Sequence, residues 1–227
     1  MNTHQSSAEV LQPFLKGKNL KRWSINYDEY YLIKIESSEN KKHPWSKLNP
    51  KEAELIFAKT YPAIYDRVKI YKEELSKRDA QGKFYWELRS CQYWDKLEAP
   101  KIIYPDIYNH QSFTFDTNNY YLANTCYFIS TNEIWLCGLL NSSIVEWFYS
   151  QISNKLRGGY LRAFTDYMKQ IPIPTVSEAD RLAIEALVQK CLDAKGRGVE
   201  EWEAEIDDRV AHLYGLTDEE MKIIRGE

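Results

Sequence analysis

The chain has 227 residues, enough for one large domain or two small ones with a hydrophobic core. It has no charged-then-apolar N-terminal signal and no apolar run of membrane-spanning length, so we expect a cytoplasmic protein without membrane contact. The 4 Cys and 4 His are scattered, with no CxxC motif and no second ligand at zinc spacing, which predicts reduced thiols and no metal site.

Charge is distributed unevenly along the chain. The net charge is −3, but residues 1–174 carry 23 Lys and Arg against 19 Asp and Glu, whereas residues 175–227 carry 7 against 14. We therefore expect the two parts to have different partners. The modest excess of +4 in the first part argues against strong non-specific binding to nucleic acid, because such binding requires many neutralised phosphates.

The first third of the chain is predicted to hold a strand followed by helices. Residues 29–36 (EYYLIKIE) are expected to form the strand. Asn49 and Pro50 form a good N-cap and first-turn pair, so a helix should begin near Lys51. Pro62 restarts this helix, which ends before Gly82 and carries one apolar stripe. The stripe consists of Tyr61, Ile64, Tyr65, Val68, Tyr71 and Leu75.

Short strands are predicted in the middle of the chain. They cover residues 101–107, 112–116 and 124–130, with a turn at Asn118 and Asn119. Residues 132–152 are predicted to form one helix. Its first half is apolar nearly all round and is therefore expected to be buried between layers.

A pair of glycines then predicts a hairpin. Gly158 and Gly159 can both adopt positive φ at little cost, which favours a two-residue turn. In that register one face of the ribbon is basic and aromatic, and the other is apolar. The first face holds Lys155, Arg157, Tyr160 and Arg162, and the second holds Leu156 and Leu161. Lys155 would lie opposite Arg162, which is unfavourable unless an anion covers the pair. The alternatives are a solvated hairpin or glycines that serve packing alone.

The C-terminal part, residues 175–227, is predicted to be an acidic helical segment. Ser177 caps the first amphipathic helix, and the GRG tripeptide at 196–198 ends it. A second amphipathic helix ends at Gly215, and Thr217 with Glu220 caps a last short helix. The first two helices suit an antiparallel hairpin.

Motifs for catalysis are absent from the sequence. It contains no Gly-rich phosphate loop and no GxSxG elbow. Asp106 and Asp116 could imitate a nuclease pair, but the acid-x-Lys motif that such sites require does not follow them. An acid such as Asp106 at a strand end more often caps a turn. A divergent nuclease is therefore only a third hypothesis, and we expect no enzymatic activity from this chain alone.

Three clusters of cations, aromatic residues and glycine indicate a binding function. They span residues 16–23, 78–89 and 155–162, and each falls in a predicted loop. Lys, Arg and backbone N–H groups are the usual partners of DNA phosphates. The candidate DNA-binding residues are Lys16, Lys18, Lys21, Arg22, Arg78, Lys83, Arg89, Lys155, Arg157, Gly158, Gly159, Tyr160 and Arg162.

These segments, taken together, resemble a known family. The stretches KRDAQGKFYWELR, KLEAPKIIYPDI, NTCYFIS, LLNSSIVEWFYSQI and LRGGYLRAFTDYMKQIPIP are similar, in this order, to the TaqI-like C-terminal specificity domain. The resemblance covers about residues 11–174, and the tail EIDDRVAHLYGLTDEEMKII resembles the helical ending of such methylases. That domain is the target-recognition part of adenine-N6 DNA methyltransferases in restriction-modification systems, including single-chain type IIG enzymes.

The resemblance implies a mixed α+β fold similar to the recognition domains of type I specificity subunits, followed by the C-terminal helical hairpin. It implies that residues 1–174 are a target-recognition domain, which grips double-stranded DNA and selects the sequence whose adenine is flipped out and methylated. The Asn-Pro-Pro-aromatic motif and the S-adenosylmethionine loop of the catalytic domain are not found in residues 1–227. We therefore expect no cofactor in this chain, and a methyltransferase catalytic domain that binds S-adenosylmethionine as its partner.

Two questions remain open from the sequence. The glycine hairpin is common to relatives with different targets, so it suits backbone contact better than base reading. Base reading is assigned to the loops 36–45 and 108–121, which are rich in Asn, His, Ser and Lys. The alternative function is a protein-interaction module of a methyltransferase complex, with only minor DNA contact.

Overall fold

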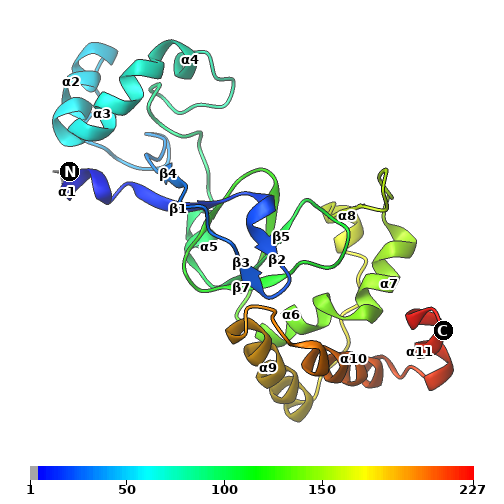
Figure 1. The fold of residues 1–227 in the computed structure, drawn as a ribbon. Helices are drawn as coiled ribbons and strands as arrows, with labels where there is room; N and C mark the ends of the chain where they lie inside the picture. The colour runs from blue at the N-terminus through cyan, green and yellow to red at the C-terminus, as the bar shows by residue number, and fades with distance from the viewer. Residues whose placement is uncertain (1–4) are drawn as a thin grey trace. The chain divides into compact units, whose positions relative to one another are not determined.

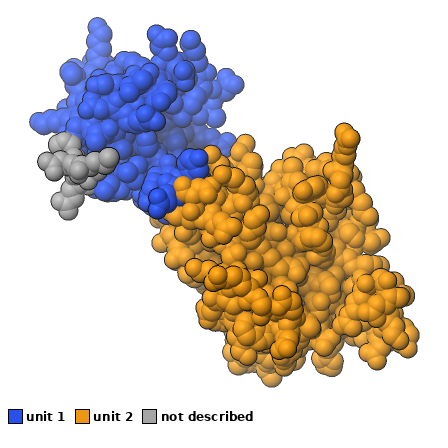
Figure 2. All heavy atoms as spheres, in the orientation of Figure 1, with its two compact units in different colours: residues 1–14, 29–95 blue, residues 15–28, 96–227 orange. Residues whose placement is uncertain are grey.

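The structure is a computed structural model that describes residues 5–227. It divides into two compact units, each assembled from separated stretches of sequence (Figure 2). Unit 1 holds the residues up to 14 together with 29–95, and unit 2 holds residues 15–28 and 96–227. The predicted α+β fold class is confirmed, because both units mix short strands with helices.

Unit 1 combines an antiparallel strand pair with short helices (Figure 1). Strand β1 (Leu11–Leu15) pairs antiparallel with β4 (Tyr31–Ile33), which is shorter than predicted. The side chain of Asn49 accepts a 3.1 Å hydrogen bond from the amide of Glu52, and this confirms the predicted start of α2. The helices are α1 (Gln5–Ala8), α2 (Pro50–Thr60), α3 (Pro62–Val68), η2 (Lys69–Tyr71) and α4 (Lys72–Ser76).

Aromatic side chains fill the core of unit 1. The rings of Phe57 and Trp86 stack with centroids 4.7 Å apart, and Phe84 stacks on Trp86 at 4.9 Å. Trp45 is fully buried against the edges of Phe57 and Trp86. Part of the aromatic surplus of this sequence therefore serves packing rather than recognition.

Unit 2 is built around a three-stranded antiparallel sheet. Its central strand β5 (Lys101–Pro105) lies between β7 (Thr114–Asp116) and β9 (Cys126–Ser130), so all three predicted strands are confirmed. The other elements up to residue 162 are η1 (Gly17–Asn19), β2 (Leu20–Lys21), β3 (Ser24–Ile25), α5 (Trp94–Glu98), β6 (Ile107–Tyr108), β8 (Tyr121–Leu122) and β10 (Leu161–Arg162).

The helix predicted over residues 132–152 is broken in two. It forms α6 (Ile134–Asn141) and α7 (Ser143–Ile152), and Ser142 between them is extended. The hydroxyl of Ser142 donates to the carbonyl of Leu139 and accepts from the amide of Val145, so it ends one helix and begins the next. The predicted burial of the first half is confirmed, since most residues of α6 are buried.

The C-terminal helices are α9 (Glu178–Asp193), α10 (Glu200–Tyr214) and α11 (Asp218–Arg225), preceded by the short α8 (Thr165–Met168). The predicted caps are present, because Ser177 accepts from the amide of Asp180 and Thr217 forms a capping box with Glu220. Gly215 takes φ 67° at the end of α10. None of the helices between residues 5 and 227 has the length and apolarity needed to cross a bilayer.

The structure does not divide at residue 174, where we placed a domain boundary. Helices α9 and α10 share one hydrophobic core with α6, α7 and the sheet of unit 2. Gly138 of α6 permits close packing against α9, because a Cβ there would lie 2.7 Å from a methyl carbon of Val188. The acidic residues 175–227 therefore form an integral part of unit 2, although their net charge is opposite in sign to that of residues 1–174.

Candidate nucleic-acid interface

The glycine hairpin (residues 155–161) has a different register from the predicted one. The amide of Leu156 donates to the carbonyl of Tyr160 at 2.7 Å, and Lys155 pairs with Leu161. The loop therefore contains three residues, Arg157 to Gly159, and both glycines take positive φ of 87° and 81°. The predicted two-residue turn was wrong by one position, which places Leu156 beside Tyr160 on the exposed tip instead of beneath it.

Arg162 does not share a face with Arg157, in contrast to our prediction. Its Nη2 lies 3.1 Å from Oδ2 of Asp106, and its guanidinium stacks over the ring of Phe164 at 4.4 Å. Arg162 belongs to strand β10, which follows the hairpin loop and pairs antiparallel with β6. The charge of this cation is therefore balanced within the protein by Asp106.

The loop formed by residues 16–21 is held by polar contacts, two of them from the buried Asn19. The Asn19 side chain accepts from the amide of Lys16 at 2.8 Å and donates to the carbonyl of Asn26 at 2.7 Å. The amide of Gly17 donates to the hydroxyl of Thr125 at 2.9 Å. A Cβ at residue 17 would lie 2.6 Å from the carbonyl oxygen of Thr125, so this position requires glycine.

Two of the three predicted clusters meet at one groove. We call it the Tyr160 groove; its volume is about 360 Å³. One wall is the loop with Lys18 and Lys21, the other is the segment from Pro105 to Ser112, and Tyr160 of the hairpin closes one side. Thr125 also lines this groove and was not predicted, because only the packing of β5 against the loop brings it there, whereas Asn109 belongs to the predicted loop 108–121.

Lys18 and Lys21 line the Tyr160 groove, whereas Lys155 and Arg157 belong to the hairpin that carries Tyr160, and these cations differ in their partners. Lys18 pairs with Asp28 at 2.6 Å, and this hydrogen bond lowers the pKa of the Asp28 carboxyl. Lys21, Lys155 and Arg157 are exposed and form no ion pair with any residue in 5–227. These three cations are therefore available to an anionic ligand, which is the property that phosphate contact requires.

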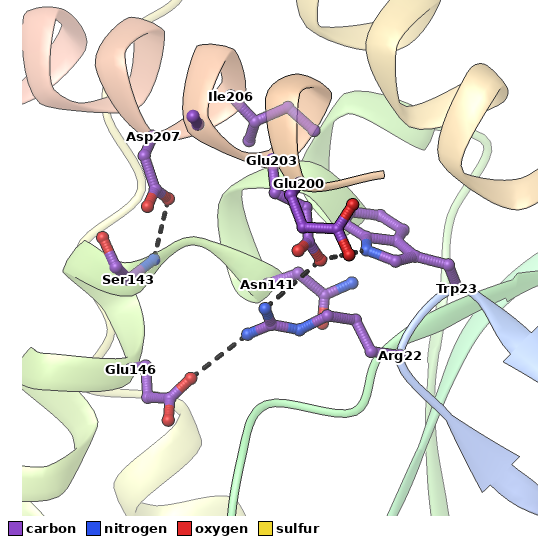
Figure 3. Close-up of a pocket in the computed structure, with 10 residues that line it drawn as sticks. Arg22, Trp23, Asn141, Ser143, Glu146, Glu200, Glu203, Ile206 and Asp207 are labelled. Atoms are coloured by element: carbon purple, nitrogen blue, oxygen red, sulfur yellow. Dashed lines mark hydrogen bonds and ion pairs between the residues drawn. The ribbon is translucent and has the colours of Figure 1, made fainter. Parts of the chain in front are cut away.

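Arg22, also a candidate for DNA contact, points away from the groove. Its guanidinium lies between two carboxylates, 3.2 Å from Glu146 and 3.2 Å from Glu203 (Figure 3). Its Nε donates to the carbonyl of Gln111 at 3.1 Å. All three bonds are internal to unit 2, so Arg22 acts within the protein rather than as a solvated cation.

The cluster at 78–89 lies in unit 1 and is largely structural. Arg78 donates to the carbonyls of Leu75, Tyr85 and Glu87, and Lys83 donates to the carbonyl of Ser46. The buried carboxylate of Glu87 is the centre of this segment. It accepts from the amides of Ser38, Lys83 and Phe84, the hydroxyl of Ser38 and the indole of Trp45. Only Arg89 of the three cations is exposed and without an internal partner in the described chain.

The two loops assigned to base reading have different environments. In the segment 108–121, Asn109 and Ser112 line the Tyr160 groove, and the exposed His110 contacts Glu146 at 2.9 Å. In the loop 36–45, the ring of His43 stacks on Trp45 at 4.6 Å and its Nε2 contacts the carbonyl of Glu36. The first loop thus shares a site with exposed cations, whereas the second belongs to unit 1.

The two acids considered for a nuclease both have internal partners. Asp106 pairs with Arg162, and Asp116 is buried with Lys101 at 2.6 Å. Asp116 also caps the following turn by accepting from the amides of Asn118 and Tyr120. No group of three or more potential metal ligands occurs among residues 5–227. Each of the two acids therefore has a cation of the same unit as its partner.

Comparison with known proteins gives a consistent result. The family model of the TaqI-like C-terminal specificity domain matches residues 12–173. The type II methyltransferase M.PaeR7I of Pseudomonas aeruginosa is 27% identical over 135 residues, which are 56% of this chain and 21% of that protein. M.BstVI of Geobacillus stearothermophilus is 27% identical over 141 residues, covering 59% of this chain and 23% of the relative.

A solved structure shows the same fold. The type IIL restriction-modification enzyme MmeI, determined in complex with DNA, aligns with a TM-score of 0.64 at 16% identity, over 93% of this chain and 29% of MmeI. The chain spans about a fifth of the length of the curated relatives it matches.

Proposed function

Because this chain belongs to the family of TaqI-like C-terminal specificity domains, we propose that it recognises a specific sequence in double-stranded DNA for a restriction-modification methyltransferase. Its role is to bind the duplex and select the site, and the methylated base is adenine at N6. The type IIG arrangement, in which recognition and methylation belong to one polypeptide, is part of the same proposal.

One observation carries this proposal. Residues of the loop 16–21 and Tyr160 of the distant hairpin line the same groove, the Tyr160 groove. The exposed cations Lys21, Lys155 and Arg157 suit phosphate oxygens, because they have no competing internal partners in the described chain. Asn109 and Ser112 supply donors and acceptors of the kind that read base edges.

Methyl transfer requires groups that we assign to a separate catalytic domain. That domain would bind S-adenosylmethionine and receive the flipped adenine. The relatives leave room for such a domain, since the matched segment covers 21–23% of their length. This chain then contributes orientation and sequence choice, and no cofactor binds to it.

A second candidate is docking of the methyltransferase part with minor DNA contact. It is favoured by an apolar groove of about 220 Å³ between α7 and α11, lined by Trp147, Tyr214, Leu216 and Ile224 among others. Exposed apolar grooves are typical of protein-binding surfaces.

Selection from a randomised duplex pool distinguishes the two candidates. The complete chain is incubated with the pool at low and at near-physiological salt, and the bound DNA is sequenced. Enrichment of a short motif is the expected result. Uniform, salt-sensitive binding would mean that sequence choice requires the catalytic part, and the absence of binding at both salt concentrations would favour the docking function.

A further inference from the structure

We infer that Arg22 and Glu203 are positioning residues for DNA recognition, and that the acidic helix α10 is therefore part of the recognition apparatus. Arg22 holds the two walls of the Tyr160 groove at a fixed separation, and Glu203 holds Arg22. This inference rests on the proposed function of the groove. It assigns a role in that function to helix α10, which does not line the groove.

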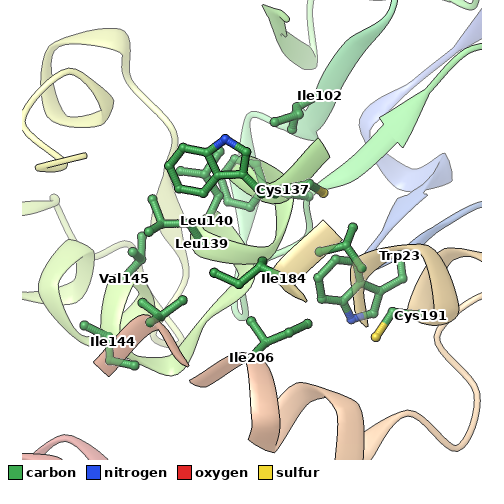
Figure 4. Close-up of a cluster of buried hydrophobic side chains, with 14 of the residues drawn as sticks. Trp23, Ile102, Cys137, Leu139, Leu140, Ile144, Val145, Ile184, Cys191 and Ile206 are labelled. Atoms are coloured by element: carbon green, nitrogen blue, oxygen red, sulfur yellow. The ribbon is translucent and has the colours of Figure 1, made fainter. Parts of the chain in front are cut away.

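The turn that carries Arg22 is anchored inside unit 2. Strands β2 and β3 pair Lys21 with Ser24, so Arg22 and Trp23 are the two residues of the connecting turn. Trp23 has φ 63°, a conformation that bulky residues rarely adopt, and its side chain is only 2% exposed. Figure 4 shows its indole beside Ile184 and Cys191 of α9. Burial of the indole therefore maintains an unfavourable backbone conformation at this position.

The same two residues connect both walls of the groove. The Nε of Arg22 donates to the carbonyl of Gln111, and the amide of Trp23 donates to the carbonyl of Phe113 at 3.2 Å. Lys21 immediately precedes this turn, and Ser112 lies between the two accepting residues. A shift of the Arg22 side chain would therefore move one wall of the groove relative to the other.

The charge of Arg22 is balanced from two other helices. Glu203 of α10 accepts from Arg22 Nη1 at 3.2 Å and from the indole Nε1 of Trp23 at 2.6 Å, both on the same oxygen. Glu146 of α7 accepts from Nη2 of Arg22. A guanidinium reaches three acceptors in three directions, which the single ammonium of Lys cannot reproduce.

A positioning role and a direct phosphate contact of Arg22 predict different effects of removing the Glu203 charge on DNA affinity. If Arg22 contacted phosphate directly, removing the competing charge of Glu203 would strengthen binding to every DNA sequence. If Arg22 positions the walls, removing that charge relaxes the groove. Discrimination between sequences then falls, while binding to unrelated duplexes is retained.

The experiment compares Glu203→Gln with Glu205→Gln in the complete chain. Gln keeps an oxygen that can accept from the Trp23 indole, so the substitution removes mainly the charge. Glu205 is a matched control, because it lies on α10 and its ion pair within residues 5–227 is with Arg209 of the same helix at 2.7 Å. Each variant is titrated with the duplex selected from the pool and with a scrambled duplex of the same composition, after its melting temperature has been measured.

We expect Glu203→Gln to lower the ratio of the affinity for the selected duplex to that for the scrambled duplex about tenfold. The affinity for the scrambled duplex itself should not change. Glu205→Gln should leave the ratio unchanged. Higher affinity for both duplexes at a constant ratio would overturn the inference. Arg22→Lys provides a second, independent test, since it keeps the charge and the apolar stem. It should lower the ratio as well, without changing the salt dependence of binding to the scrambled duplex.

The outcomes separate this inference from the proposed function. If the wild-type chain does not distinguish the two duplexes, the proposed function fails for this chain by itself, and sequence choice requires the catalytic part. If the wild-type chain distinguishes them and both Glu203→Gln and Arg22→Lys do so equally well, only the inference fails.

Discussion

The ammonium of Lys101 and the carboxylate of Asp116 lie 2.6 Å apart in the interior of unit 2, and both side chains are fully buried. The two residues face each other on the paired strands β5 and β7. The ammonium of Lys101 also donates to the carbonyl of Leu97, and the carboxylate of Asp116 accepts two amides of the next turn. The pair is thus embedded in a hydrogen-bonded network, which compensates the cost of removing both charges from water.

Replacing one member of this pair is expected to be strongly destabilising. Lys101→Met leaves the Asp116 carboxylate buried without its counter-charge, so the free energy of unfolding should fall by about 3–5 kcal/mol. Urea denaturation measures this change. The double variant Lys101→Met, Asp116→Asn should recover part of the loss, and a loss below about 1 kcal/mol in the single variant would contradict the role assigned to the pair.

Removal of the acidic tail should unfold unit 2. A chain ending at residue 174 lacks the buried side chains of Ile184, Leu187, Val188, Ile206 and Val210. Burying five such side chains contributes roughly 10 kcal/mol, which is comparable to the whole stability of a domain. We expect this shortened chain to give no cooperative thermal transition for unit 2. A truncated protein with native-like near-UV circular dichroism and intact DNA binding would show that the tail is dispensable.

The cations of the glycine hairpin should contribute to affinity and not to sequence choice. Lys155→Ala with Arg157→Ala removes two exposed charges, so binding to all duplexes should weaken, and the slope of log K against log salt should become less steep by about 1.8. Arg162 is excluded from this test because it pairs with Asp106.

Arg197→Ala with Lys222→Ala is the control for the hairpin variant, since both residues are exposed in unit 2 and neither lines the Tyr160 groove. Its salt slope should match the wild type. A change in the preferred sequence of the Lys155, Arg157 variant would show instead that the hairpin reads bases.

Asp207 makes the stability of unit 2 depend on pH. Burial raises the pKa of Asp207 above its ordinary value, partly offset by hydrogen bonds from Ser143 at the start of α7. The folded chain therefore binds this proton more tightly than the unfolded chain, so the contribution of Asp207 to stability falls as pH rises through the raised pKa.

Asp207→Asn keeps an oxygen acceptor for the Ser143 amide and cannot ionise. Relative to the wild type, its free energy of unfolding should increase as pH rises from about 3 to about 6, because only the wild type loses stability over this range. Chemical denaturation at several pH values measures the difference between the two proteins. A difference that is constant over this range, or one that decreases, would contradict the assigned pKa shift.

Local features were predictable from the sequence, whereas partners distant in sequence were not. The caps at Asn49, Ser177 and Thr217 were correct because each depends on a residue three positions away. The hairpin register was wrong because a Gly-Gly pair suits both two-residue and three-residue loops, and the choice depends on how β10 pairs with β6.

The internal role of Arg22 could not be recognised from composition. Its acceptor Glu203 lies 181 residues further along the chain, and the tail that carries Glu203 reads as a separate acidic segment. For the same reason the KFYWELR stretch indicated a DNA-binding loop, although Phe84, Tyr85 and Trp86 belong to the core of unit 1. A mixture of cations and aromatic residues therefore identifies contact surfaces only after burial is known.

Photo-crosslinking from position 160 tests the central claim most directly. Tyr160 is replaced by the photoreactive residue p-benzoylphenylalanine, and the chain is irradiated with the selected duplex; Ile223, which is 65% exposed on α11, is replaced in the same way as a control. If the Tyr160 groove binds the duplex, a crosslink to DNA forms from position 160 and none forms from position 223. Crosslinks from position 223 with none from position 160 would contradict the assignment of this groove as the DNA interface.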